Sequence, residues 1–240
     1  FHITVVDKEA SRPMAKELTK AEIRRNPLAG WVAATVQIIR ERKILAIGSL
    51  AGILAIVGGF ALYTWHQTQR EREAQGLLVK AYTAMWGDAS SAQRNPEQAK
   101  TLYAEMAAKY PGTVAAEEAL IRLGNLQFDG NKYDEAIKAY GEYLATYPSG
   151  RFRVMAAVGK AYAEEAKGDL PAAEKTLTHV LETAKDDPLI GEAYSSLAHV
   201  YEVMKKPDDA VRVYSQIAER FPQTHWAQNA LQRMSALKNK

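Results

Sequence analysis

The sequence predicts an all-α protein in which a single transmembrane helix precedes an α-solenoid of helical repeats. Three observations carry this prediction. Residues 44–65 form an uncharged apolar run, and the chain after Gln67 is dominated by Ala, Glu, Lys, Leu, Gln and Arg, which favour helices. A residue pair ending in Pro also recurs every 34 to 40 residues. We expect four segments: a flexible cytoplasmic tail over 1–25, an amphipathic juxtamembrane helix over 26–43, the transmembrane helix over 44–65 and a repeat domain over 66–240.

The apolar run over 44–65 has 22 residues and no charged side chain. As a helix rising about 1.5 Å per residue it is about 33 Å long, enough to cross a bilayer core of about 30 Å. Gly59-Phe60-Ala61 has the small residues of a signal-peptide cleavage site. Signal-peptide apolar regions are shorter, however, and follow a short basic start, whereas 43 residues precede this run. We therefore expect a retained anchor.

The basic residues beside the anchor predict its orientation. Arg40, Arg42 and Lys43 lie directly before it, and residues 1–43 carry nine Lys or Arg against five Asp or Glu. Cytoplasmic flanks are enriched in Lys and Arg. This predicts a single-pass protein of the bacterial inner membrane with a cytoplasmic N-terminus and a periplasmic C-terminal domain. Residues 66–240 are left with 22 basic and 23 acidic side chains, which gives no electrostatic footprint for nucleic acid.

The segment before the anchor has the pattern of an amphipathic helix. Asn26-Pro27 supplies a cap and a proline at the first helical position. One face of that helix carries Leu28, Trp31, Val32, Thr35 and Ile39. It either lies on the membrane surface and contacts lipid or a partner, or it extends the transmembrane helix into the cytoplasm. Residues 1–13 lack this pattern, and Met14 is a candidate natural start.

The anchor itself carries a stripe of small residues. Small residues at four-residue spacing let a second helix approach closely, although Gly and Ala are also common in membrane helices generally. The candidate packing residues of the membrane helix are Gly48, Gly52, Ala51, Ala55 and Gly59.

The chain after the anchor repeats a pattern of two helices and a stop. The stops are Tyr110-Pro111, Tyr147-Pro148, Asp187-Pro188 and Phe221-Pro222. Proline ends a helix because it lacks the N–H group and clashes with the preceding turn. We expect the aromatic residue before each proline to pack on a neighbouring repeat.

Two units fit the 34-residue tetratricopeptide (TPR) pattern at many fixed offsets. One contains Leu120, Leu123, Gly124, Ala136, Tyr140, Tyr143 and Pro148, and the last contains Tyr194, Leu197, Ala198, Tyr201, Ala210, Tyr214, Ile217 and Pro222. In a third unit Ala173 and Leu177 fit, whereas Gly159 and Tyr162 are out of step. The predicted domain is a TPR α-solenoid of about four helix pairs, with residues 225–238 as a capping helix. Asn95 caps one helix, and the first repeat helix continues from the anchor.

No catalytic pattern assembles in the sequence. The five histidines have no metal-ligand spacing, there is no nucleophile elbow or phosphate-binding glycine loop, and the chain has no cysteine. Asp186-Asp187 and Asp208-Asp209 lie beside prolines in predicted turns, where helix-start or solvated roles outweigh acid–base catalysis. We expect no enzyme activity, no cofactor, no metal and no small-molecule substrate.

Protein binding is the activity that a repeat stack supports. First-helix side chains that point into the concave face would grip an acidic or extended polypeptide segment. Taken singly, each of these side chains fits a solvated helix face better than a binding role, and only the set as a whole favours binding. The candidates are Arg122, Asn125, Phe128, Arg153, Lys160, His199 and Glu202.

The layout of one membrane helix followed directly by exported TPR repeats resembles the YfgM-like family of ancillary Sec-translocon subunits. The Tyr-Pro stops and the closing FPQTHWAQNALQRM also resemble the repeats of BamD- and CpoB-type envelope proteins. These resemblances imply a membrane-anchored scaffold or adaptor linked to protein secretion or periplasmic chaperones. The alternative is a structural accessory subunit of a large inner-membrane complex.

Overall fold

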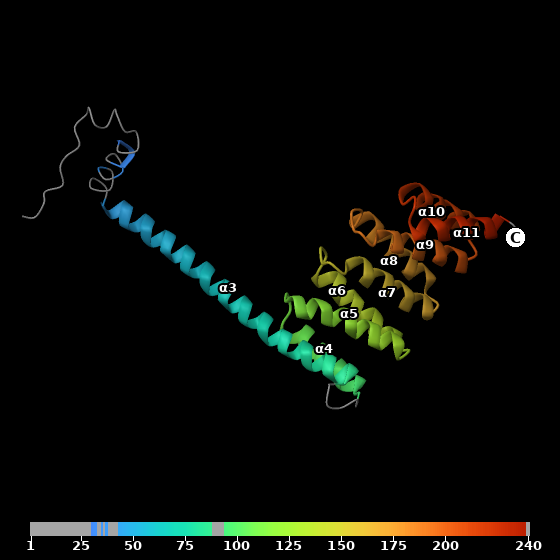
Figure 1. Cartoon of the computed structure of the whole chain (residues 1–240), viewed down its shortest axis with the longest axis horizontal. Helices are drawn as coiled ribbons and strands as arrows, with labels where there is room; N and C mark the ends of the chain where they lie inside the picture. The colour runs from blue at the N-terminus through green and yellow to red at the C-terminus, as the bar shows by residue number, and fades with distance from the viewer. Residues whose placement is uncertain (1–29, 33–34, 36, 38–42, 88–93, 239–240) are drawn as a thin grey trace, which may run out of the picture. The chain divides into compact units, whose positions relative to one another are not determined.

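The computed structural model describes residues 30–32, 35, 37, 43–87 and 94–238. All regular structure in these ranges is helical, and no strand occurs in them. With the labels of Figure 1, the helices are α3 (Lys43–Trp86), α4 (Pro96–Lys109), α5 (Val114–Asp129), α6 (Tyr133–Thr146), α7 (Arg153–Ala166), α8 (Leu170–Thr183), α9 (Ile190–Val203), α10 (Pro207–Arg220) and α11 (His225–Lys238).

The chain divides into two compact units, Phe1–Thr64 and Trp65–Lys240. In the first unit, the large apolar side chains of α3 are exposed along its length. The exposed fraction is 87% at Ile44, near the start of the helix, and 61% at Tyr63. Among the described residues, one helix, α3, is both long enough and apolar enough to cross a membrane, judged by length and composition. Apolar surface of this extent is unfavourable in water, so lipid or another apolar partner has to cover it.

The expected tail over 1–25 lies outside the described residues, and so do Met14 and most of the expected juxtamembrane helix. The described residues of that helix are all helical: Gly30, Trp31, Val32, Thr35, Gln37 and Lys43, the last of which begins α3. Trp31 and Val32 are exposed.

The helix ends of the second unit follow the sequence signals. Asn95 caps α4, because its side-chain oxygen accepts a hydrogen bond from the Gln98 N–H at 3.0 Å, as predicted. Tyr110, Tyr147 and Phe221, which precede the prolines, are the C-terminal caps of α4, α6 and α10. In contrast, α8 ends well before its proline stop: four residues, the last of them Asp187, lie between the end of this helix and the proline.

Successive helices pack against one another as helix pairs. The pairs are α5–α6, α7–α8 and α9–α10, and α11 packs on α10. The part of α3 in the second unit packs on α4 through a cluster that includes Ala74, Leu78, Ala81, Tyr103 and Met106. The all-α class and the TPR-type solenoid that the sequence predicts are therefore confirmed.

Helices pack closely around the ring of Tyr140. A Cβ atom built on Gly124 of α5 would lie 2.5 Å from Cε1 of this ring, and one built on Gly159 of α7 would lie 2.7 Å from its Cζ. Real Cβ atoms do not approach that closely, so both positions require glycine as long as the ring stays in place. Tyr140 thus fills the space between the first helices of two neighbouring pairs.

Substituting Gly124 by alanine tests this packing. Glycine-to-alanine changes normally stabilise a helix interior by about 0.5–1 kcal/mol. At Gly124 the added methyl group overlaps the Tyr140 ring, so we expect a net destabilisation of about 1–3 kcal/mol. Urea unfolding of the full chain in detergent, followed by circular dichroism, measures the change.

Gly76→Ala is the matched control for Gly124→Ala. Gly76 is exposed on α3, and a Cβ atom built there meets nothing within 4 Å. This variant should be neutral or slightly more stable than the original chain. If both variants gained stability alike, the described packing around Tyr140 would be wrong.

Candidate functional site

The helix pairs follow one another along the stack in chain order (Figure 1). The first helix α7 packs closely against both α5 and α9, whereas the backbones of the second helices α6, α8 and α10 stay farther apart from one another. A stack curves toward the layer whose members are closer together. We call the inner side the first-helix face; α5, α7, α9 and residues 75–86 of α3 form it.

A pocket of about 330 Å³ opens on the first-helix face between α5 and α7. Its apolar walls include Phe128, Met155 and Tyr162, and the side chains of Met155 and Tyr162 are about 40% exposed. Exposed methionine and tyrosine are common at protein-binding surfaces, because methionine adapts its shape and tyrosine combines an apolar ring with a hydroxyl group. The pocket therefore offers an apolar side chain a place to dock.

Asn125 is held at this pocket by the core. The Tyr140 hydroxyl donates a hydrogen bond to Asn125 Oδ1 at 2.6 Å. Burial raises the pKa of Tyr140 to about 12, so its hydroxyl remains a donor at physiological pH. With its oxygen engaged, Asn125 has its amide N–H groups left to donate to a peptide carbonyl.

Arg122 belongs to a charged cluster nearer the start of the stack. The Tyr82 hydroxyl donates to Glu118, and Arg122 donates to Glu118 Oε1 at 3.1 Å. Burial alone would disfavour the ionised carboxylate, but the hydrogen bonds from Tyr82 and Arg122 outweigh it and lower the pKa of Glu118. Burial also raises the pKa of Tyr82, with the Glu118 hydrogen bond adding to the effect.

His199 and Glu202 lie farther along the same face. His199 Nε2 is 3.0 Å from Oε1 of Glu165, whose second carboxylate oxygen is buried without a protein partner. Glu202 accepts hydrogen bonds from the Tyr214 hydroxyl at 2.6 Å and from Arg233 Nε at 3.0 Å. Burial opposes ionisation of Glu202, yet Arg233 and Tyr214 lower its pKa overall.

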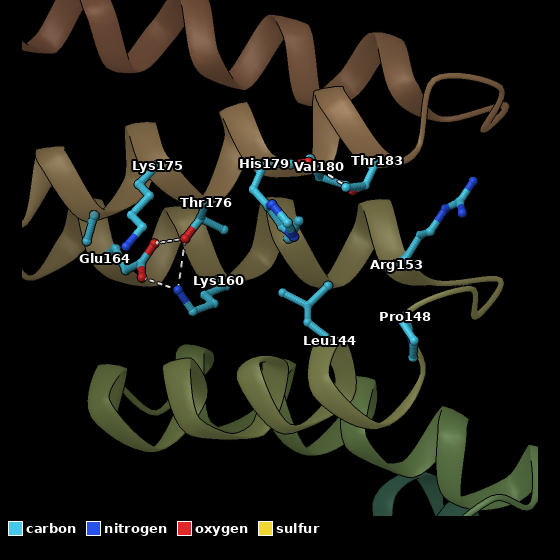
Figure 2. A pocket seen from close by; sticks show the side chains of 12 residues that line it. Leu144, Pro148, Arg153, Lys160, Glu164, Lys175, Thr176, His179, Val180 and Thr183 are labelled. Carbon is cyan, nitrogen blue, oxygen red and sulfur yellow. Dashed lines mark hydrogen bonds and ion pairs between the residues drawn. The ribbon is translucent and has the colours of Figure 1, made fainter.

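The remaining two candidates, Arg153 and Lys160, lie on the opposite side of α7. They line a pocket of about 480 Å³ with residues of α8 and with Leu144 and Pro148 (Figure 2). Lys160 contacts the buried Glu164 and donates to Thr176 at 2.8 Å, and Arg153 pairs with Asp187 at 3.3 Å. We call this the outer pocket.

The register of α7 explains why these two residues face outward. Gly124, Ala161 and Ala198 each lie five residues before the end of a first helix, and all three are buried. If Gly159 is taken for this position in place of Ala161, every residue of α7 is assigned to a position two residues away from its true one. At about 100° per residue this turns the expected inner face by about 200°, which puts Lys160 where Tyr162 lies.

Sequence reasoning did not select Met155, Tyr162, Tyr82 or Glu165. A signal for Tyr162 exists, because Asn125, Tyr162 and His199 are separated by 37 residues each. The same interval separates the stops Tyr110-Pro111 and Tyr147-Pro148. Aligning the three first helices on this interval finds the middle of the first-helix face.

The small-residue stripe of the anchor is open in the structure. A Cβ atom built on Gly48, Gly52 or Gly59 meets nothing within 4 Å, and Ala51 and Ala55 are exposed. Helix packing through this stripe stays a prediction. Within the described residues, no group of three or more His, Cys, Asp or Glu is placed to hold a metal ion.

The stacked helix pairs, with one pocket on the first-helix face and one on the opposite side of α7, define a helical repeat protein of the TPR class. Residues 80–240, two thirds of the chain, match the family model described as "YfiO: Outer membrane lipoprotein". The chain therefore belongs to the YfiO family. The match confirms the resemblance of the repeats to BamD-type proteins, whereas the YfgM-like resemblance stays a prediction. The apolar segment over 44–65 lies outside the match.

No curated protein matches the chain. Among solved structures, a similar one contains nearly identical TPR-like repeats of a Podosopora anserina protein described as a kinesin light chain. The two are 12% identical with a TM-score of 0.49, over 72% of this chain and 85% of the other.

The Glu118 cluster predicts a pH dependence of stability. A carboxyl group whose folded pKa lies below its unfolded value, near 4.5, stabilises the folded state above that pH. This contribution disappears as the pH falls through the folded pKa. We expect Glu118→Gln to be less stable than the original chain at pH 7, with the gap closing between about pH 5 and pH 3.

Urea unfolding at a series of pH values measures this gap. Glu182→Gln is the control, because Glu182 is exposed on α8. The control should show little difference from the original chain at any pH. A Glu118→Gln deficit that stays constant from pH 7 to pH 3 would contradict the assigned role of the carboxylate.

Proposed function

We propose that this protein is a non-enzymatic, membrane-anchored TPR scaffold of the bacterial cell envelope that binds segments of other proteins on its first-helix face. The observation that carries the proposal is the pocket between α5 and α7. It combines exposed Met155 and Tyr162 with an amide at Asn125 that the core holds in place. An extended polypeptide presents both groups that this pocket takes, an apolar side chain and a backbone carbonyl.

The membrane part of the proposal rests on α3 and its flank. A helix whose large apolar side chains are 57% to 87% exposed over residues 44–65 favours a lipid environment, and three basic residues directly precede the apolar run. We infer an anchor in the inner membrane with the repeat domain in the periplasm. Membership of the YfiO family, described as outer membrane lipoproteins, supports a place in the envelope.

The proposed role is that of an adaptor for exported proteins, linked to secretion or to periplasmic chaperones. The alternative is a structural accessory subunit of one large inner-membrane complex. The small-residue stripe of the anchor favours this alternative, because Gly48, Gly52 and Gly59 would let a membrane partner approach closely. The two roles differ in the number of partners and in their stoichiometry.

Site-specific photo-crosslinking in bacterial cells separates the two roles. A photoreactive amino acid replaces Tyr162 on the first-helix face, and the crosslinked proteins are identified by mass spectrometry. The adaptor role predicts many exported proteins at low occupancy, since a pocket for one side chain and one peptide group accepts many sequences. One partner captured in fixed stoichiometry would support the accessory-subunit role instead.

The control places the same photoreactive residue at Gln216, which is exposed on the second helix α10. It should capture far fewer of these proteins than position 162. Equal capture at both positions would contradict binding on the first-helix face. Capture of cytoplasmic proteins alone would contradict the proposed orientation.

A further inference from the structure

The outer pocket lies in a groove that the stack leaves open between two second helices. Because the backbones of α6 and α8 stay apart, the side of α7 that faces away from the first-helix face forms the floor between them. Figure 2 shows Leu144 extending from α6 and His179 from α8 toward the same space. The cavity of about 480 Å³ is within the range of ligand-binding sites.

Apolar side chains of three helices form part of the lining of the outer pocket. They are Leu144 of α6, Ala157 of α7, and Ala172 and Val180 of α8, and Pro148 adds a further apolar surface. An apolar side chain of a partner would exclude water from this apolar lining, which contributes a binding free energy of about 25 cal/mol per Å² of apolar area buried. The apolar lining supplies affinity for apolar groups but does not select among them.

Charge at the rim supplies the selection. Two cations of the rim are neutralised within the protein, since Lys160 pairs with Glu164 and Arg153 pairs with Asp187. Lys175 has no ion-pair partner among the described residues. His179 lies one helical turn farther along α8, is exposed like Lys175, and its ring N–H can donate in either protonation state.

The spacing of these two donors suits one carboxylate. Side chains four residues apart on a helix have Cβ atoms about 5–6 Å from each other. The Lys175 ammonium and a His179 ring nitrogen can therefore approach the same acidic group from two sides. The only carboxylate that lines the outer pocket, Glu164, is already engaged by Lys160 and by Thr176, which donates to it at 2.8 Å.

The neighbouring groove between second helices, one repeat earlier in the chain, has a different charge. It lies between α4 and α6, has a cavity of about 260 Å³, and is lined by Glu135, Glu142 and Lys138 together with several alanines. Acidic groups are unfavourable beside Glu135 and Glu142 and favourable beside Lys175. The two grooves therefore differ in the partner that each accepts.

We propose that the outer pocket is a second docking site, which takes a segment of a partner protein carrying an acidic residue next to a large apolar side chain. The carboxylate binds Lys175 and His179, and the apolar side chain enters the cavity over Leu144 and Val180. This site is separate from the first-helix face, so the protein holds two segments on opposite sides of the stack.

Fluorescence anisotropy tests this site with the full chain in nanodiscs of zwitterionic lipid. The probe is a short fluorescein-labelled peptide in which pairs of leucines alternate with pairs of acidic residues. Binding should weaken about tenfold or more when Lys175→Glu and His179→Glu are combined, and it should weaken with rising salt. A peptide with Asn and Gln in place of its acidic residues should also bind at least about tenfold more weakly.

Lys138→Glu is the control for Lys175→Glu, because it makes the same lysine-to-glutamate change in the neighbouring groove. It should change the affinity by less than about twofold. Circular dichroism confirms that each variant is folded, and the neutral peptide tests the charge requirement on the unmodified protein. Equal affinity for the acidic and neutral peptides, or equal loss in Lys138→Glu, would overturn the proposal.

Nanodiscs that contain anionic lipid distinguish a lipid headgroup from a protein segment. If the pocket takes protein segments, anionic lipid leaves peptide binding unchanged apart from the general effect of charge, which Lys138→Glu also reports. Competition by anionic lipid that disappears in the Lys175→Glu and His179→Glu variant would identify a lipid site and overturn the proposal. Loss of this site would leave crosslinking at position 162 unaffected.

Discussion

The repeat stack depends on the ring of Tyr140, which fills the space between Gly124 of α5 and Gly159 of α7. Neither glycine carries a side chain, so the two first helices approach closely and the ring is buried between them. The same residue builds the functional surface. Its hydroxyl fixes Asn125, and its ring and Gly159 form part of the pocket on the first-helix face. Packing and binding are thus coupled through one side chain.

Curvature gives the stack two unlike sides. First helices contact one another on the inner side, which brings Asn125 and Tyr162 of neighbouring pairs into one pocket. Second helices stay apart on the outer side, and a groove between them exposes the floor of α7. The inner pocket offers apolar and amide groups, whereas the outer pocket offers apolar groups with a free cation at Lys175. Two pockets of unlike chemistry suit the two different segments proposed for them.

Local signals in the sequence predict much of this structure, because proline stops and an asparagine cap act within one turn. Tyr110, Tyr147 and Phe221 end their helices where the sequence places them, and Asn95 starts α4. The face of α7 could not be predicted in the same way. It depends on whether Gly159 or Ala161 takes the position that Gly124 holds in α5, and no signal within one turn of the helix decides between two small residues; only the 37-residue interval that relates Asn125, Tyr162 and His199 does. A shift of two residues on a helix exchanges opposite faces, so Arg153 and Lys160 line the outer pocket instead.

A double-mutant cycle between Gly124→Ala and Tyr140→Ala tests the central claim, that one aromatic ring sets the spacing of the first helices α5 and α7. Removing the ring opens space beside Gly124, so the added methyl group then has nothing to overlap. The account predicts that Gly124→Ala loses its cost in the Tyr140→Ala background, with a coupling free energy of about 1 kcal/mol or more from urea unfolding. Additive effects of the two substitutions would contradict it.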